Sequence, residues 1–168
     1  GITDNHLSTF SRAVSKGALA SLEKLSLGEN EIGDGGITAF ANVVSNGALP
    51  NLESLFLNNN QISDTGIASL ADAVSNGALP NLNTLWLQDN KIGDVGLQAL
   101  SEALGKGALA LASLKTLYLY NNKIGDPGIT ALADALGKGA LASLAELYVD
   151  NDEHPALLAA CQARGIAL

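Results

Sequence analysis

The sequence predicts an α/β solenoid, a short open horseshoe with a parallel concave sheet and convex helices. The pattern L-x-x-L-x-L-x-x-N occurs four times, at residues 22–30, 52–60, 82–90 and 114–122. A fifth, degraded copy, L-A-E-L-Y-V-D-N-D, covers residues 144–152. Successive copies start 30 residues apart, with one spacing of 32, and apolar residues at helical spacing follow the first four. Such a period indicates stacked units that cover each other's apolar faces.

The first half of each repeat predicts a short strand. In Leu55-Phe56-Leu57 the side chains alternate with period two, so the leucines face the core and the central residue faces outward. The asparagine that ends the pattern is expected to form a ladder, because buried amides need hydrogen-bond partners and can satisfy backbone groups of successive turns. The ladder residues are Asn30, Asn60, Asn90 and Asn122.

The second half of each repeat predicts a helix that opens on an aspartate. The aspartates are Asp34, Asp64, Asp94 and Asp126. Each is the expected N-cap, with its carboxylate accepting backbone N–H groups of the first turn, and Pro127 suits the first helical position. The helices are expected at about 35–45, 65–75, 95–104 and 127–137. The segments S-N-G-A-L and G-K-G-A-L should end them, because glycine adopts the left-handed C-cap conformation.

We expect one domain spanning residues 1–168, with repeats starting near 22, 52, 82, 114 and 144. Parallel strands stack about 4.8 Å apart and helices about 8–10 Å apart, so the strands should line the concave face. Residues 1–21 form an N-terminal half repeat, either a natural cap or an atypical repeat of a longer array. Residues 153–168 contain a C-terminal cap helix near Pro155–Arg164, whose inner face carries Leu157, Leu158 and Cys161.

The repeats resemble those of the ribonuclease-inhibitor-like subfamily of leucine-rich-repeat proteins, the repeat type of intracellular receptors. The resemblance rests on the 30-residue period, a helix in each repeat and the motif I-G-D-x-G-I/L that opens it, and it covers essentially all 168 residues. It implies a leucine-rich-repeat solenoid that serves as a protein-binding surface. These repeats are uniform and the array is short, so strict transfer of ribonuclease inhibition is not expected.

Composition narrows the functional classes. The net charge of −8 argues against nucleic-acid binding, which depends on Lys and Arg neutralising phosphates. No apolar run approaches the roughly 18 residues that cross a membrane. A single cysteine, Cys161, excludes an internal disulfide framework, and no N-x-S/T glycosylation motif occurs. We therefore expect a cytoplasmic protein, either a monomer or a fragment of a larger protein.

Motifs for enzyme chemistry are absent from the sequence. It contains neither the phosphate-binding G-x-x-x-x-G-K-S/T motif nor G-x-G-x-x-G after a strand. His6 and His154 lie at opposite ends, and His154 would stand about 10 Å from Cys161 along one helix axis. The acidic cluster at 150–154 could hold a divalent ion, but it lacks calcium-loop spacing and is better interpreted as a solvated turn. We expect no enzyme activity, no cofactor and no metal.

The candidate site lies on the outward face of the strands. The central position of L-x-L is occupied in turn by Ser26, Phe56, Trp86, Tyr118 and Tyr148, and Tyr120 follows on the same face. Five of the seven aromatic residues therefore share one surface. Cross-strand stacking would explain such a stripe, and so would a binding site; the two can coexist. Acidic residues flank the rings against only Lys24 and Lys115: Glu23, Glu29, Glu53, Asp89, Glu146 and Asp150.

These observations predict a non-enzymatic protein–protein interaction module whose partner carries a basic patch. The predicted partner-binding residues are Phe56, Trp86, Tyr118, Tyr120, Tyr148, Glu53, Asp89 and Glu146. One alternative is glycan or small-ligand binding on the aromatic platform, although an open arc lacks the enclosed pocket such ligands usually need. Another is a structural scaffold subunit that uses its convex helices.

Overall fold

A computed structural model of the protein describes residues 1–106 and 111–168, in which six helices alternate with five strands. The helices are α1 (Asp4–Val14), α2 (Asp34–Ser45), α3 (Asp64–Ser75), α4 (Asp94–Lys106), α5 (Asp126–Gly137) and α6 (Pro155–Arg164). The strands are β1 (Lys24–Ser26), β2 (Ser54–Phe56), β3 (Thr84–Trp86), β4 (Thr116–Tyr118) and β5 (Glu146–Tyr148). The predicted helices are present. The second strand lies one residue earlier than the predicted Leu55–Leu57.

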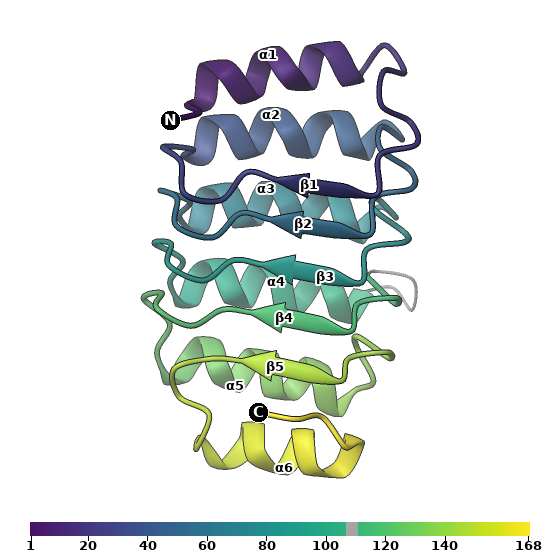
Figure 1. Ribbon diagram of the computed structural model, residues 1–168. Coiled ribbons are helices and arrows are strands. Elements are labelled where there is room, and N and C mark those ends of the chain that lie inside the picture. Colours follow the sequence, from purple (N-terminus) through teal and green to yellow (C-terminus); the bar gives the residue numbers. More distant parts are fainter. Residues whose placement is uncertain (107–110) are drawn as a thin grey trace.

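All five strands form one parallel sheet in the order of the chain. Figure 1 shows the strands in one layer and the helices in a second layer behind them, with the two chain ends at opposite ends of the stack. The predicted α/β solenoid is thus confirmed. Strands pack more closely than helices do, so the sheet forms the concave side.

The core lies between the two layers and runs the length of the stack. Leu55 and Leu57 are fully buried, whereas Phe56 between them is half-buried on the opposite side of the strand. The same alternation recurs in the other strands. The predicted assignment of inward and outward residues is therefore confirmed.

The asparagine ladder is also confirmed. The side chain of Asn60 accepts a hydrogen bond from the backbone N–H of Ile32 at 2.9 Å. Its amide nitrogen donates to the carbonyls of Leu27 and Leu57 at 2.9 and 3.1 Å. Asn90 repeats these bonds one turn later, with Ile62 and Leu57. Each ladder residue therefore connects its own repeat to the preceding one.

The prediction that each aspartate caps its own helix is wrong. Asp34 is the first residue of α2, and its N-cap is Gly33. The Asp34 carboxylate instead accepts hydrogen bonds from the backbone N–H groups of Ser63 and Gly66, at 2.8 and 3.0 Å. Those two N–H groups belong to the N-terminus of α3. The carboxylate points along the stack rather than back to its own first turn, and Asp64 and Asp94 likewise accept backbone N–H groups at the start of the next helix. Asp126 differs, because its carboxylate accepts a hydrogen bond from the side-chain amide of Asn151 at 2.9 Å.

Two kinds of glycine serve the helix ends. A Cβ at Gly66 would lie 2.6 Å from Oδ1 of Asp34, so only glycine leaves room for the carboxylate that caps α3. At the other end, Gly47 and Gly77 follow α2 and α3 with φ of 84° and 86°. This left-handed conformation is the predicted glycine cap, and it favours glycine because no Cβ clashes. The corresponding Gly107 lies outside the described residues.

The C-terminal end of the core is covered as expected. Leu157 and Cys161 on α6 are buried, while Leu158 is half-buried and covers less of the core than predicted. After α6, the chain returns to β5, where Ala167 exchanges backbone hydrogen bonds with Leu147 and Ala145 at 2.9 and 2.8 Å. None of the helices in the described ranges combines the length and apolar character needed to cross a membrane.

Candidate functional site

Five rings lie on the open face of the sheet, and we call them the aromatic row: Phe56, Trp86, Tyr118, Tyr120 and Tyr148. The parallel register makes Phe56 the direct partner of Trp86, Trp86 of Tyr118, and Tyr118 of Tyr148. Residues at the same position of successive repeats are therefore direct neighbours in the folded sheet. The structure brings together all five aromatic residues that the sequence predicted.

The rings of the aromatic row contact each other without a break from β2 to β5. The ring centroids of Phe56 and Trp86 are 4.5 Å apart, and those of Trp86 and Tyr118 are 5.2 Å apart, in tilted or edge-on arrangements. Tyr118 stacks on Tyr148 at 4.3 Å with an angle of 12° between the rings, and Tyr120 lies edge-on at 6.1 Å. Tyr148 is the most open ring, at 38% exposure, and the others are half-buried. Stacking of this kind holds each ring in place while leaving part of it open to solvent.

The middle of the row is neutral and incompletely hydrogen-bonded. Burial raises the pKa of Tyr118, and the neighbouring Tyr148 adds to the effect. The phenol is uncharged at neutral pH in any case, and the raised pKa extends its neutral range to more alkaline pH. Trp86 Nε1 and Gln88 Oε1 are both buried and have no hydrogen-bond partner among the described residues. Unpaired buried polar atoms are uncommon in native proteins. These two lie on the outward side of the central repeat, beside the aromatic row.

The predicted acidic residues lie at both ends of the strands, with the rings between them. Glu53 precedes β2 and Glu146 begins β5, and both are exposed. Asp89 follows β3 and is half-buried. Glu53 accepts a hydrogen bond from Asn83 at 3.3 Å, and Asp89 accepts one from Asn121 at 2.9 Å. The carboxylates of Glu53 and Asp89 thus connect adjacent repeats.

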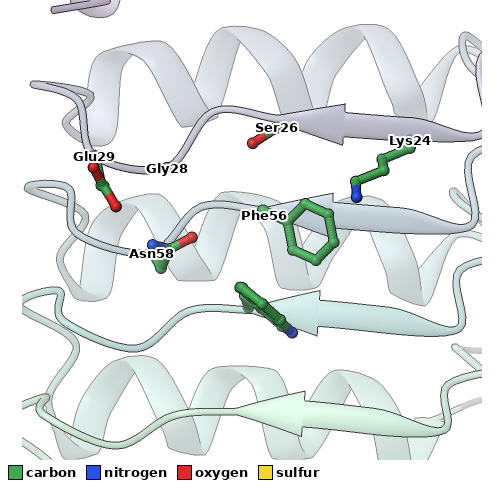
Figure 2. A pocket seen from close by; sticks show the side chains of 7 residues that line it. Lys24, Ser26, Gly28, Glu29, Phe56 and Asn58 are labelled. Atoms are coloured by element: carbon green, nitrogen blue, oxygen red, sulfur yellow. The ribbon is translucent and has the colours of Figure 1, made fainter.

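A hollow that the sequence did not predict lies at the N-terminal end of this face (Figure 2). Its volume is about 440 Å³, and it is open to solvent. The lining residues are Lys24, Ser26, Gly28, Glu29, Phe56, Asn58 and Trp86. The only sequence signal was Ser26, which stands where the later repeats carry rings. That signal marks a small side chain but does not tell whether a neighbour fills the space.

Other chemically reactive residues are dispersed. His6 belongs to α1 and His154 precedes α6, at opposite ends of the stack. Cys161 lies on the buried side of α6. Within residues 1–106 and 111–168, no three His, Cys, Asp or Glu side chains gather closely enough to hold a metal ion. The aromatic row and its hollow are therefore the surface that calls for a functional explanation.

Comparison with known families identifies the repeats. A model for two-copy leucine-rich repeats matches residues 50–102 and 80–134, which together make up half of the chain. A second leucine-rich-repeat model matches residues 18–41. The chain therefore belongs to the leucine-rich-repeat family. Domains of this family generally mediate protein–protein interactions.

Solved structures with the same architecture agree with this assignment. Actin-binding site 2 of leiomodin-1 superposes with a TM-score of 0.74 and 16% identity, over 92% of this chain and 84% of that chain. At that identity the likeness is one of fold. An internalin from Listeria monocytogenes superposes with a TM-score of 0.54 and 26% identity, over 95% of this chain but only 40% of the internalin. A comparison with curated proteins finds no match.

Proposed function

We propose that this protein is a non-enzymatic protein–protein interaction module that binds its partner on the aromatic row. The observation that carries the proposal is the unbroken contact of five rings, from Phe56 to Tyr148, on the open side of the sheet. A contiguous apolar surface that stays partly open to solvent is typical of an interaction site. Tyr and Trp are also enriched among the residues that contribute most to binding energy.

Ring stacking makes the aromatic row suitable for binding as well as for stability. Each ring touches a neighbour, so its side-chain torsions are already restricted before a partner arrives. Less conformational entropy is then lost on binding, and a larger part of the contact energy appears as affinity. Trp86 lies near the centre of the row, where such residues typically have the largest effect.

The charge of the surface favours a partner with a basic patch. Glu53, Asp89 and Glu146 surround the aromatic row, and the whole chain carries a net charge of −8. Complementary charge increases association rates and excludes wrong partners. The same charge disfavours nucleic acid, whose phosphates need Lys and Arg. The proposal includes no cofactor, metal or membrane, because its chemistry is contact between protein surfaces.

The 30-residue period and a full helix in each repeat support the ribonuclease-inhibitor-like subfamily. Continuous packing from α1 to α6 supports one domain over residues 1–168, acting as a monomer or as part of a larger protein. One structure of the same fold bears the name of an actin-binding site, which supports a protein partner in general and not actin in particular. The lone buried thiol of Cys161 supports a cytoplasmic setting.

The test is partner capture with surface variants. Trp86→Ala and Tyr118→Ala should each weaken partner binding by about 2 kcal/mol or more, as for central aromatic residues of other interfaces. The controls are Asp72→Ala and Asp134→Ala, which change exposed residues of α3 and α5 on the helical side. These controls should leave binding nearly unchanged.

Two outcomes would overturn the proposal. If the aromatic variants bind normally while the Asp72 and Asp134 variants do not, the helices are the interface and the row only reinforces the sheet. If the protein captures glycans on an array and the aromatic variants lose that binding, the row is a carbohydrate platform. Trp86 fluorescence provides a first readout, because partner contact should shift its emission.

A further inference from the structure

The aromatic row stops one strand before the sheet does. Ser26 on β1 is the direct neighbour of Phe56 on β2, as Trp86 is of Phe56 on the other side. Every later strand places a ring at this position, and neighbouring rings fill the space between strands. Ser26 is too small to do so. The hollow of about 440 Å³ occupies the place that a further ring of the row would take.

The lining of the hollow combines aromatic walls with a polar floor. Phe56 and Trp86 form the apolar wall, with their ring centroids 4.5 Å apart. A Cβ at Gly28 would lie 2.4 Å from Oδ1 of Asn58, so the Asn58 amide lies directly over Gly28 and forms part of the floor. Figure 2 shows Lys24 at one end and Glu29 at the other, with the Phe56 ring between them.

The charges select among possible occupants. The ammonium group of Lys24 lies 4.9 Å from the centre of the Phe56 ring, in the range of a cation–π contact. A second cation against the same ring, such as a partner's arginine, would be repelled by Lys24. A neutral ring has no such penalty, and it can lie against Phe56 and Trp86 as the rings of the row lie against each other. Lys24 remains available to pair with a carboxylate next to that ring.

We propose that this hollow receives a tyrosine or phenylalanine side chain of the protein partner, next to a carboxylate that pairs with Lys24. The proposal rests on the proposed function, because it assumes that this face of the sheet binds a protein. It also predicts how the partner is oriented on the sheet. The partner's aromatic side chain lies over β1 and β2 with a single carboxylate at Lys24, and its basic patch lies along the acidic residues of the same face, which include Glu53, Asp89 and Glu146.

The first experiment uses small probes and the whole protein. N-acetyl-tyrosine amide is titrated into 15N-labelled protein, with N-acetyl-leucine amide as the aliphatic comparison. Saturable NMR shifts are expected at Lys24, Ser26 and Asn58 and at the Trp86 indole, and the leucine probe should bind more weakly. Uniform shifts along the whole row, or equal binding of both probes, would overturn the proposal.

Variants then test the hollow itself. Ser26→Tyr adds the missing ring and should weaken binding of N-acetyl-tyrosine amide by at least about fivefold, since ring contacts contribute that order of affinity. Ser45→Tyr adds the same ring at an exposed residue that ends α2 and serves as the matched control. Thermal unfolding checks that both variants fold. Unchanged probe binding by folded Ser26→Tyr would overturn the proposal.

The Lys24 contact has an independent readout that needs no added ring. N-acetyl-tyrosine, which has a free carboxylate, should bind about two- to threefold more tightly than its amide, as exposed ion pairs contribute little. Lys24→Gln should bring the ratio of the two affinities to about one, and the test is this ratio and not the affinity of either probe alone. Equal affinities of the two probes for the wild-type protein would remove the carboxylate from the proposal.

Partner binding separates this proposal from the proposed function. If Trp86→Ala loses the partner and Ser26→Tyr retains it, the aromatic row is the interface but the hollow is not used. If both variants retain the partner, the proposed function itself is wrong. Loss of binding in both variants, together with localised probe shifts, is the result that we expect.

Discussion

The two sides of the same five strands follow different rules. On the inner side, a leucine stands at the centre of every strand: Leu25, Leu55, Leu85, Leu117 and Leu147. On the outer side, the next residue changes from serine through phenylalanine and tryptophan to tyrosine. The inner side must fit a neighbouring repeat of identical shape, so its residues are uniform. The outer side also contacts neighbouring strands, but no second layer of helices covers it, so its residues can differ from one repeat to the next.

The largest expected effect lies on the inner side. Leu57 is fully buried, and Leu57→Ala should lower the free energy of unfolding by about 2–5 kcal/mol, because a cavity forms in a packed core. Leu87→Ala should behave in the same way, and the damage should extend into adjoining repeats. Denaturant unfolding measures both. A loss below about 1 kcal/mol at both sites would contradict the inner-side assignment.

Variants of the asparagine ladder remove hydrogen bonds from the inner side, whereas Leu57→Ala removes packed volume. Asn60→Ala removes the partner of the Ile32 N–H and of three carbonyls, so it should cost about 1–3 kcal/mol. Asn30→Ala should cost less, because Asn30 is only half-buried and lies in the first repeat. Urea unfolding measures the free energy of unfolding of both variants. If Asn60→Ala and Asn30→Ala lower it equally, the ladder stabilises the fold through its amide geometry and not through burial.

Two glycine-to-alanine variants in the helices should change the stability of the protein in opposite directions. Gly66→Ala places a Cβ 2.6 Å from the Asp34 carboxylate and should destabilise the protein by about 1–3 kcal/mol, as overpacking does. Gly105→Ala in α4 is the matched control, since a Cβ there meets no atom within 4 Å among the described residues. It should stabilise the protein by about 0.5–1 kcal/mol through helix propensity. The thermal unfolding midpoint should therefore fall for Gly66→Ala and rise for Gly105→Ala, relative to the wild type.

The outer side should lose binding more than stability. Trp86→Ala removes ring contacts with Phe56 and Tyr118, so we expect a stability loss of about 1–2 kcal/mol, less than at Leu57. The ring faces outward and leaves no sealed cavity when it is removed. A stability loss as large as that of Leu57→Ala would show that the aromatic row belongs to the core and would remove the contrast between the two sides.

The smallest effect concerns the Cys161 thiol on the buried side of α6. Burial raises the pKa of Cys161, and Arg164 offsets part of this rise. The folded state therefore keeps the thiol protonated at pH values where the unfolded state ionises it. This contribution to stability is fully present below the ordinary thiol pKa and is lost as the pH rises through the folded-state pKa.

Two measurements check the expectation for Cys161. The folded protein should react slowly with a thiol reagent, and the urea-unfolded protein rapidly. The unfolding free energy of Cys161→Ala should also fall less steeply at alkaline pH than that of the wild type. Rapid labelling of the folded protein would contradict the burial of this residue, which is 1% exposed.

Much of the fold was predictable because the repeat pattern reports burial directly. Leucines at strand spacing predicted the inner side, and the helix boundaries followed from apolar spacing and the flanking residues. Asn60 was predictable as a ladder residue because a buried amide at a fixed position in each repeat has few other uses. The aromatic row was predictable as well, since residues at one position of a uniform repeat must align across a parallel sheet.

By itself, the sequence determined which residue types recur at which position, and therefore the solenoid, its inner leucines and its aromatic row. Only the tertiary structure decided which neighbour each side chain meets. Asp34 caps α3 and not its own helix, and Ser26 leaves a hollow that no neighbour fills. Leu49, just 1% exposed, takes a left-handed φ of 54°, a conformation unusual for leucine. In a solenoid these contacts join residues about one repeat apart, and a period in the sequence shows their spacing but not their direction.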